Sequence, residues 1–156
     1  VLEDTLITFS LPAFISRNSR RQVLSTPKYL FFDVGIKNII MGNSLNPKNI
    51  KGDLAGKLFE HFIVTELIKR IKYSYPQYKY FFWRTNHGLE VDFIIQTEDE
   101  IIPIEIKYTK LPQKNHIKNL KFFMDEYKCK RGFLIGTFKE PLKLTSKITA
   151  IPWKQI

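Results

Sequence analysis

The sequence is poor in cysteine, in long apolar runs and in acidic residues, and each shortage excludes a class of protein. A single cysteine, Cys129, cannot form a disulfide within the chain, so nothing indicates an oxidising compartment. No apolar run approaches the roughly 18 residues of a membrane span, and the N-terminus lacks the pattern of a secretory signal. We therefore expect a cytoplasmic protein with no membrane association.

The shortage of acids gives the chain a strongly basic balance. Lys and Arg number 25 against 15 Asp and Glu, which leaves a net charge of +10 over 156 residues. Such a surplus favours a polyanionic partner such as DNA, although basic surfaces also serve solubility. Hydrophobic residues make up 44% of the chain, enough to build a core. The length fits one domain, with residues 1–50 as a lead-in region packed on a core formed by residues 51–156.

Hydrophobic spacing predicts the order of elements in that core. Apolar residues three and four apart indicate a helix over about 53–71, with Asp53 as its N-cap, and a second helix over about 113–127. Alternating runs predict strands at 80–84, 89–95, 101–108, 131–135 and 147–151. The lead-in region shows only short extended pieces at 6–9 and 28–32. The chain therefore reads as a mixed α/β fold.

Two of these strands carry acids where a sheet is normally apolar. Because side chains alternate along a strand, Glu90 and Asp92 share one face of theirs while Val91 and Phe93 share the other. On the next strand, Glu105 and Lys107 share a face. The short turn "QTEDE" at 96–100 allows Asp92 and Glu105 to become neighbours if the register is right.

Neighbouring carboxylates repel each other unless a cation or a proton lies between them. A hard ion such as Mg²⁺ or Mn²⁺ suits a carboxylate pair, and no thiolate or imidazole set suggests zinc. Lys107 would then hold an attacking water or stabilise charge on a phosphate. The alternative is a simple surface ion pair between Glu105 and Lys107.

The first predicted helix supplies two further acids. A helical wheel places Glu60 on the flank of the apolar stripe, from which it could reach the sheet, and Glu66 inside the stripe. We expect Glu60 to contribute to the metal site and Glu66 to be structural, with a buried partner. His61, His87 and His116 lack the spacing of metal ligands.

A helix carrying Glu60, then "EVDFII" with Asp92 and "IPIEIKY" with Glu105 and Lys107, resembles the PD-(D/E)XK, or restriction-endonuclease-like, nuclease superfamily. The resemblance implies an αβββαβ core with a mixed central sheet flanked by helices. It also implies that Glu60, Asp92 and Glu105 bind Mg²⁺ and that Lys107 assists the nucleophilic water. The proline of the motif has no counterpart before Asp92. The resemblance places Arg84 on the rim of the site.

A narrower resemblance rests on "FSLPAF", "STPKYLFFDVGIKN", "GKLFEHFIVTEL", "FFWRTNHGLEVDFII" and "IPIEIKYTKLP". These segments are similar to a C-terminal domain of unknown function that follows the ATPase module in prokaryotic AAA-type ATPases. The resemblance implies a fragment of a longer ATPase, with the ATPase module upstream. "GDLAGKL" is not a phosphate loop, because its glycines are too close together and Leu58 stands where Ser or Thr is needed.

The sequence thus predicts a metal-dependent DNA endonuclease domain, with two alternatives: a catalytically inactive module that binds DNA or a protein partner, and a docking domain. Glu90 and His87 are further candidates beside the site. Trp83 is expected in the core. Basic residues that could follow a phosphate backbone, or form an ordinary solvated face, are Arg17, Arg20, Arg21 and Lys28 near the N-terminus, and Lys110, Lys114, Lys118 and Lys121 after the Glu105 strand.

Overall fold

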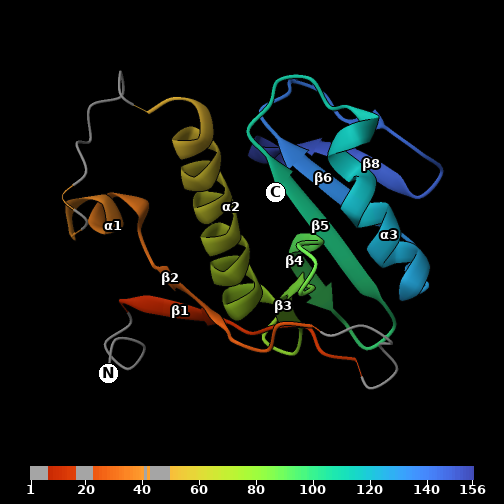
Figure 1. Ribbon diagram of the computed structural model, residues 1–156, viewed down its shortest axis with the longest axis horizontal. Coiled ribbons are helices and arrows are strands. Elements are labelled where there is room, and N and C mark those ends of the chain that lie inside the picture. Colours follow the sequence, from red (N-terminus) through yellow and green to blue (C-terminus); the bar gives the residue numbers. More distant parts are fainter. Residues whose placement is uncertain (1–6, 17–22, 41, 43–49) are drawn as a thin grey trace.

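The computed structural model describes residues 7–16, 23–40, 42 and 50–156 and shows a mixed α/β fold (Figure 1). Its elements are, in order, β1 (Thr8–Leu11), β2 (Lys28–Phe31), α1 (Val34–Ile40), α2 (Gly52–Ser74), β3 (Lys79–Arg84), β4 (Glu90–Gln96), β5 (Ile101–Lys107), the 3₁₀ turn η2 (Lys114–Ile117), α3 (Lys118–Glu126), β6 (Gly132–Gly136), β7 (Leu142–Lys143), β8 (Ile148–Pro152) and the 3₁₀ turn η3 (Trp153–Gln155).

Six strands form one mixed sheet in the order β3-β4-β5-β6-β8-β7. The first three are antiparallel neighbours, whereas β5, β6 and β8 run parallel and β7 returns antiparallel to β8. The parallel register aligns Lys107 with Gly136 and Gly136 with Pro152. The carboxyl ends of three strands therefore lie in one row. The expected order of helix, three strands, helix and strand, with a further strand at the end, is confirmed.

Helices α2 and α3 cover opposite faces of the sheet (Figure 1). Under α2, Ile63 and Ile68 pack with Phe93, Ile104 and Ile106 of the strands. The other cluster joins side chains of α3 to residues of the opposite sheet face, among them Leu120, Phe123, Trp83, Ile94 and Leu134. Trp83 is fully buried, so its expected place in the core is confirmed. Both faces are closed by apolar contacts, which holds the strands rigidly.

The N-terminal segment pairs β1 with β2 and attaches them to α2 and β3. Ala13 bridges to Phe82 of β3, and the Nε2 atom of His61 lies 2.8 Å from the carbonyl oxygen of Phe31. His61 is buried, so this contact gives it a structural role. The short helix α1 was not predicted from the sequence. The extended piece expected at 6–9 is found two residues later, at Thr8–Leu11.

Two helix boundaries differ from expectation. Asp53 is not the N-cap, because α2 begins at Gly52 after an extended Lys51; Asp53 lies in the first turn and pairs with Lys57 at 2.6 Å. The second helix is divided into the turn η2 and helix α3. In the part of the chain that the structure describes, no helix has the length and apolar character needed to cross a bilayer.

Candidate active site

Asp92 lies at a bulge in β4, and the bulge sets its direction. Phe81 pairs with Ile94 and Trp83 with Val91, so β4 spends one more residue than β3 over this stretch. As a result, Val91 packs in the α3 cluster and Phe93 in the α2 cluster. The expectation that these two residues share a face is therefore wrong. A bulge breaks the period-two alternation of side chains that a regular strand would give.

The carboxylate of Asp92 takes over part of the sheet's hydrogen bonding. The β4–β5 ladder ends at the pair Phe93 and Ile104. Just beyond it, the backbone N–H of Ile106 donates to Oδ2 of Asp92 at 2.7 Å. Asp92 is only 6% exposed. Its carboxylate is thus fixed against β5 at the point where the two strands stop pairing.

Glu105 and Lys107 project from the face of β5 opposite Ile104 and Ile106, as strand alternation requires. The Nζ atom of Lys107 lies 2.6 Å from Oε1 of Glu105 and 3.9 Å from Oδ2 of Asp92. Glu105 is buried, and its Oε2 atom has no hydrogen-bond partner among the described residues. The structure therefore brings Asp92, Glu105 and Lys107 together and leaves one buried carboxylate oxygen unpaired.

Burial makes these charges costly. Loss of solvent raises the pKa of Asp92 well above its usual value, and the negative charges of Glu105 and Glu60 raise it further. Burial also raises the pKa of Glu105, while the ammonium of Lys107 opposes that shift. For Lys107, burial lowers the pKa, but attraction to Asp92 and Glu105 outweighs it and the pKa rises. Two buried carboxyl groups thus share one ammonium, and the site is short of positive charge.

Glu60 of α2 lies near this group but is engaged elsewhere. Its Oε1 atom lies 3.7 Å from Nζ of Lys28, which in turn lies 2.5 Å from Oε1 of Glu90. Glu60 acts on Asp92 and Glu105 through its charge. Across residues 7–16, 23–40, 42 and 50–156, no three His, Cys, Asp or Glu side chains are gathered closely enough to hold a metal ion.

Lys28 is neither solvated nor free for phosphate, the two places that the sequence offered for it. Its ammonium joins Glu60 and Glu90 and lies 4.9 Å from the centre of the Phe82 ring. The pairing joins residues 62 positions apart. No local pattern in the sequence signals it. Arg17, Arg20 and Arg21, which the sequence groups with Lys28, lie outside the described residues.

The remaining candidates border the site at different places. The Nε atom of Arg84 lies 3.8 Å from Oε2 of Glu90. His87 is exposed in a turn that Gly88 closes with a positive φ of 82°. His116 of η2 was discounted as a ligand, yet the positive charge of Lys107 adds to the effect of burial in lowering its pKa. The turn η2 therefore lies within electrostatic reach of Lys107.

Glu66 does not occupy the position expected for it. It is half exposed and pairs at 2.8 Å with Lys69, which is half exposed too, and no buried partner for it is found among the residues that the structure describes. The expected stripe counted Phe62, which is 37% exposed. The buried face of α2 is instead centred on Ile63, Val64 and Ile68, and Glu66 falls outside it.

The basic residues after β5 lie on the surface. Lys114, Lys118 and Lys121 are all exposed on η2 and α3, and Lys110 follows β5. Leu120, Phe123 and Met124 fill the core side of α3, so these lysines occupy its outer side. Their spacing therefore gives the solvent-facing surface that the sequence predicted.

Comparison with known proteins extends the description to a family. A search of curated proteins finds no match. A family model described as "Domain of unknown function (DUF4143)" matches residues 55–156, from the first turns of α2 to the end of the chain. The match contains Glu60, Asp92, Glu105 and Lys107 but not Lys28. The chain therefore belongs to this DUF4143 family.

Proposed function

We propose that the chain is a metal-dependent phosphodiester hydrolase that cleaves DNA. The observation that carries the proposal is the pair of buried carboxylates, Asp92 and Glu105, at the point where β4 and β5 stop pairing, with Lys107 against them. The fold order and these residues support the resemblance to the PD-(D/E)XK superfamily. We also propose that the domain works attached to a AAA-type ATPase, on the resemblance alone.

The donor set fits a divalent cation. Glu105 offers a buried oxygen with no partner among the described residues, and Asp92 offers a second carboxylate held in place by Ile106. These are the hard oxygen ligands that Mg²⁺ or Mn²⁺ takes in small number, with water and phosphate completing the shell. Asp92 and Glu105 would hold the ion, and Glu60 would join them on release from Lys28.

Bound there, the ion would neutralise the carboxylates, polarise the phosphate and make a water more acidic. The chain's own residues orient the reaction. The ammonium of Lys107 lies against Glu105 and is half exposed, so it can donate a hydrogen bond to a phosphate oxygen or to the attacking water. Asp92 stays fixed by its bond to β5. The lysines on α3 supply phosphate contacts away from the reacting atoms.

Cleavage of plasmid DNA with Mg²⁺ or Mn²⁺ tests the proposal. We expect Asp92→Asn, Glu105→Gln and Lys107→Met each to abolish cleavage while circular dichroism remains native. Glu140→Gln is the control, since Glu140 is an exposed acid that belongs neither to this site nor to α2. Cleavage that persists in Asp92→Asn, or in excess chelator, would contradict the proposal.

The pairing of Glu60 with Lys28 favours a second candidate, a module of the same fold that binds DNA without cleaving it. In that case Glu60 and Glu90 are structural partners of Lys28, and Lys107 neutralises Glu105. This candidate predicts salt-sensitive DNA binding with no turnover in either metal. A gel-shift and cleavage assay on the same samples separates the two.

A further inference from the structure

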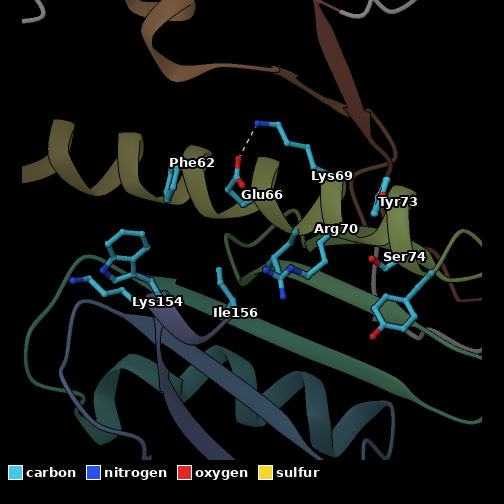
Figure 2. A pocket seen from close by; sticks show the side chains of 11 residues that line it. Phe62, Glu66, Lys69, Arg70, Tyr73, Ser74, Lys154 and Ile156 are labelled. Carbon is cyan, nitrogen blue, oxygen red and sulfur yellow. Dashed lines mark hydrogen bonds and ion pairs between the residues drawn. The ribbon is translucent and has the colours of Figure 1, made fainter.

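A groove with a volume of about 550 Å³ runs between α2 and the C-terminal segment, away from the acids (Figure 2). Its walls combine aromatic and basic side chains. Phe62 and Tyr73 come from α2, and Trp153 comes from η3. Lys69 and Arg70 of α2 and Lys154 of η3 add three positive charges. The volume falls within the range of about 300–1,000 Å³ that is usual for ligand sites.

Some of the charged side chains that line the groove point into it and others point away from it. Figure 2 shows Arg70 extending from α2 toward the segment that carries Lys154 and Ile156, whereas the Glu66–Lys69 ion pair lies on the outer side of the helix. Glu66 is the single acidic side chain in the lining, and Lys69 already neutralises it. The side-chain charge left in the lining is therefore positive, from Arg70 and Lys154. This charge favours an anionic occupant.

The aromatic residues favour an occupant with flat rings. Phe62 and Trp153 meet edge to face with ring centres 5.8 Å apart, and both remain partly open to solvent. Tyr73 is 92% exposed further along the helix. Eleven residues separate Phe62 from Tyr73, which is about 16 Å along an α-helix. Rings at both ends with Arg70 between them match the stacking platforms and charged grooves that hold single-stranded nucleic acid.

The groove and the candidate active site both adjoin the carboxyl edge of the sheet. Lys107 and Pro152 end the aligned strands β5 and β8, and each is followed by an aromatic residue, Tyr108 and Trp153. Both aromatic residues touch α2: the Tyr108 ring lies 5.4 Å from Phe59, and Trp153 lies against Phe62. Two pairs of rings, one on Phe59 and one on Phe62, therefore lie along α2 next to the ends of β5 and β8.

We propose that this groove binds a single strand of nucleic acid that enters or leaves the site at Lys107, with bases stacked on Trp153 and Phe62 and a phosphate bound by Arg70. The inference rests on the proposed function, because it names the form of substrate that the same site takes. The strand crosses the carboxyl ends of β5, β6 and β8 and then lies along α2.

Binding is measured without hydrolysis by titrating the protein with oligothymidylate in EDTA. The chain has two tryptophans, and Trp83 is fully buried, so a change in tryptophan emission reports on Trp153. We expect the oligonucleotide to quench this emission. We expect Trp153→Leu to weaken binding by about fivefold or more, as the loss of one stacked base implies. The anisotropy of a labelled strand measures this affinity. Arg70→Ala should make the plot of log affinity against log salt shallower by about 0.7, the value for one single-strand phosphate contact.

Lys139→Ala is the control, since it removes an exposed lysine outside the groove. Equal quenching of the tryptophan emission by duplex DNA or by polyglutamate would overturn the inference, the latter in favour of an acidic peptide. An affinity for the oligonucleotide that is unchanged in both Arg70→Ala and Trp153→Leu would also overturn the inference. Quenching of tryptophan emission without hydrolysis in Mn²⁺ would support strand binding in the groove and refute the proposed nuclease activity. Hydrolysis in Mn²⁺ without quenching would support the nuclease activity and refute strand binding in the groove.

Discussion

Asp92 combines a favourable hydrogen bond with an unfavourable buried charge. Its carboxylate accepts the Ile106 N–H, yet its charge is buried beside Glu105. One hydrogen bond and a shared ammonium do not offset this burial, since its pKa still rises well above the usual value. Carboxyl groups whose pKa is shifted this far by burial and a neighbouring charge are typical of functional sites, which supports the proposed cation site.

The raised pKa of Asp92 predicts how stability depends on pH in the absence of metal. The folded state binds this proton more tightly than the unfolded state does, so the stabilisation is complete below the usual pKa of 3.8 and is lost as pH rises through the raised value. We expect Asp92→Asn to flatten this loss. Above the raised pKa, the variant should be more stable by about 1 kcal/mol or more. Urea denaturation in EDTA across a pH series measures both effects, and identical slopes for variant and wild type would refute the assignment.

Lys107 predicts a coupling between stability and metal. Lys107→Met removes the ammonium that lies 2.6 Å from Glu105, so the metal-free protein should lose about 1–3 kcal/mol. Mn²⁺ should then stabilise the variant more than the wild type, because the cation faces less positive charge. Binding at a hundredfold excess over Kd contributes about 2.7 kcal/mol. Thermal denaturation with and without Mn²⁺ tests this, with Lys110→Met as the control. An equal Mn²⁺ response in wild type and Lys107→Met would contradict it.

Strand β2 supplies the cation that pairs with Glu60 of helix α2. Lys28 of β2 joins Glu60 to Glu90 of β4, so three elements meet at one ammonium. We expect Lys28→Met to raise Mn²⁺ affinity about fivefold, equivalent to about 1 kcal/mol of removed repulsion, and to free Glu60 as a ligand. The same variant should lower metal-free stability.

Calorimetric titration with Mn²⁺ measures this affinity. Lys79→Met is the matched control, because Lys79 begins β3 and pairs with Gln96 at the far end of β4 from Glu90. An unchanged affinity in Lys28→Met would show that Glu60 and Lys28 lie outside the electrostatic field of the metal site.

The elements also show what the sequence predicts well and what it does not. Strand alternation correctly placed Glu105 and Lys107 together, since β5 is regular. It failed at Val91 and Phe93, because the bulge depends on the pairing with β3, which no local pattern encodes. The Lys28 contacts depend on residues far apart in the chain. Helix α1 is too short for a periodic pattern to identify.

For the whole molecule, the two faces of the sheet carry different chemistry. The turn η2 and helix α3 present a basic outer surface made by Lys114, Lys118 and Lys121, on the face of the sheet where Glu105 and Lys107 project. Helix α2 covers the other face and forms one wall of the aromatic groove. A nucleic acid that crosses the carboxyl edge of the sheet at Lys107, as we propose, would meet both surfaces.

This arrangement predicts that α3 contributes most to the salt dependence of duplex binding. Each phosphate that a lysine neutralises contributes about 0.9 to the slope of log affinity against log salt for duplex DNA. We expect the triple change Lys114→Ala, Lys118→Ala and Lys121→Ala to reduce the slope by about 2–3. The control carries three changes on exposed lysines elsewhere, Lys130→Ala, Lys139→Ala and Lys143→Ala. Because both triples lower the net charge of +10 equally, overall charge cannot explain a difference between them. Anisotropy titrations in EDTA at several salt concentrations give the slopes, and equal slopes for the two triples would exclude α3 as the duplex-binding surface.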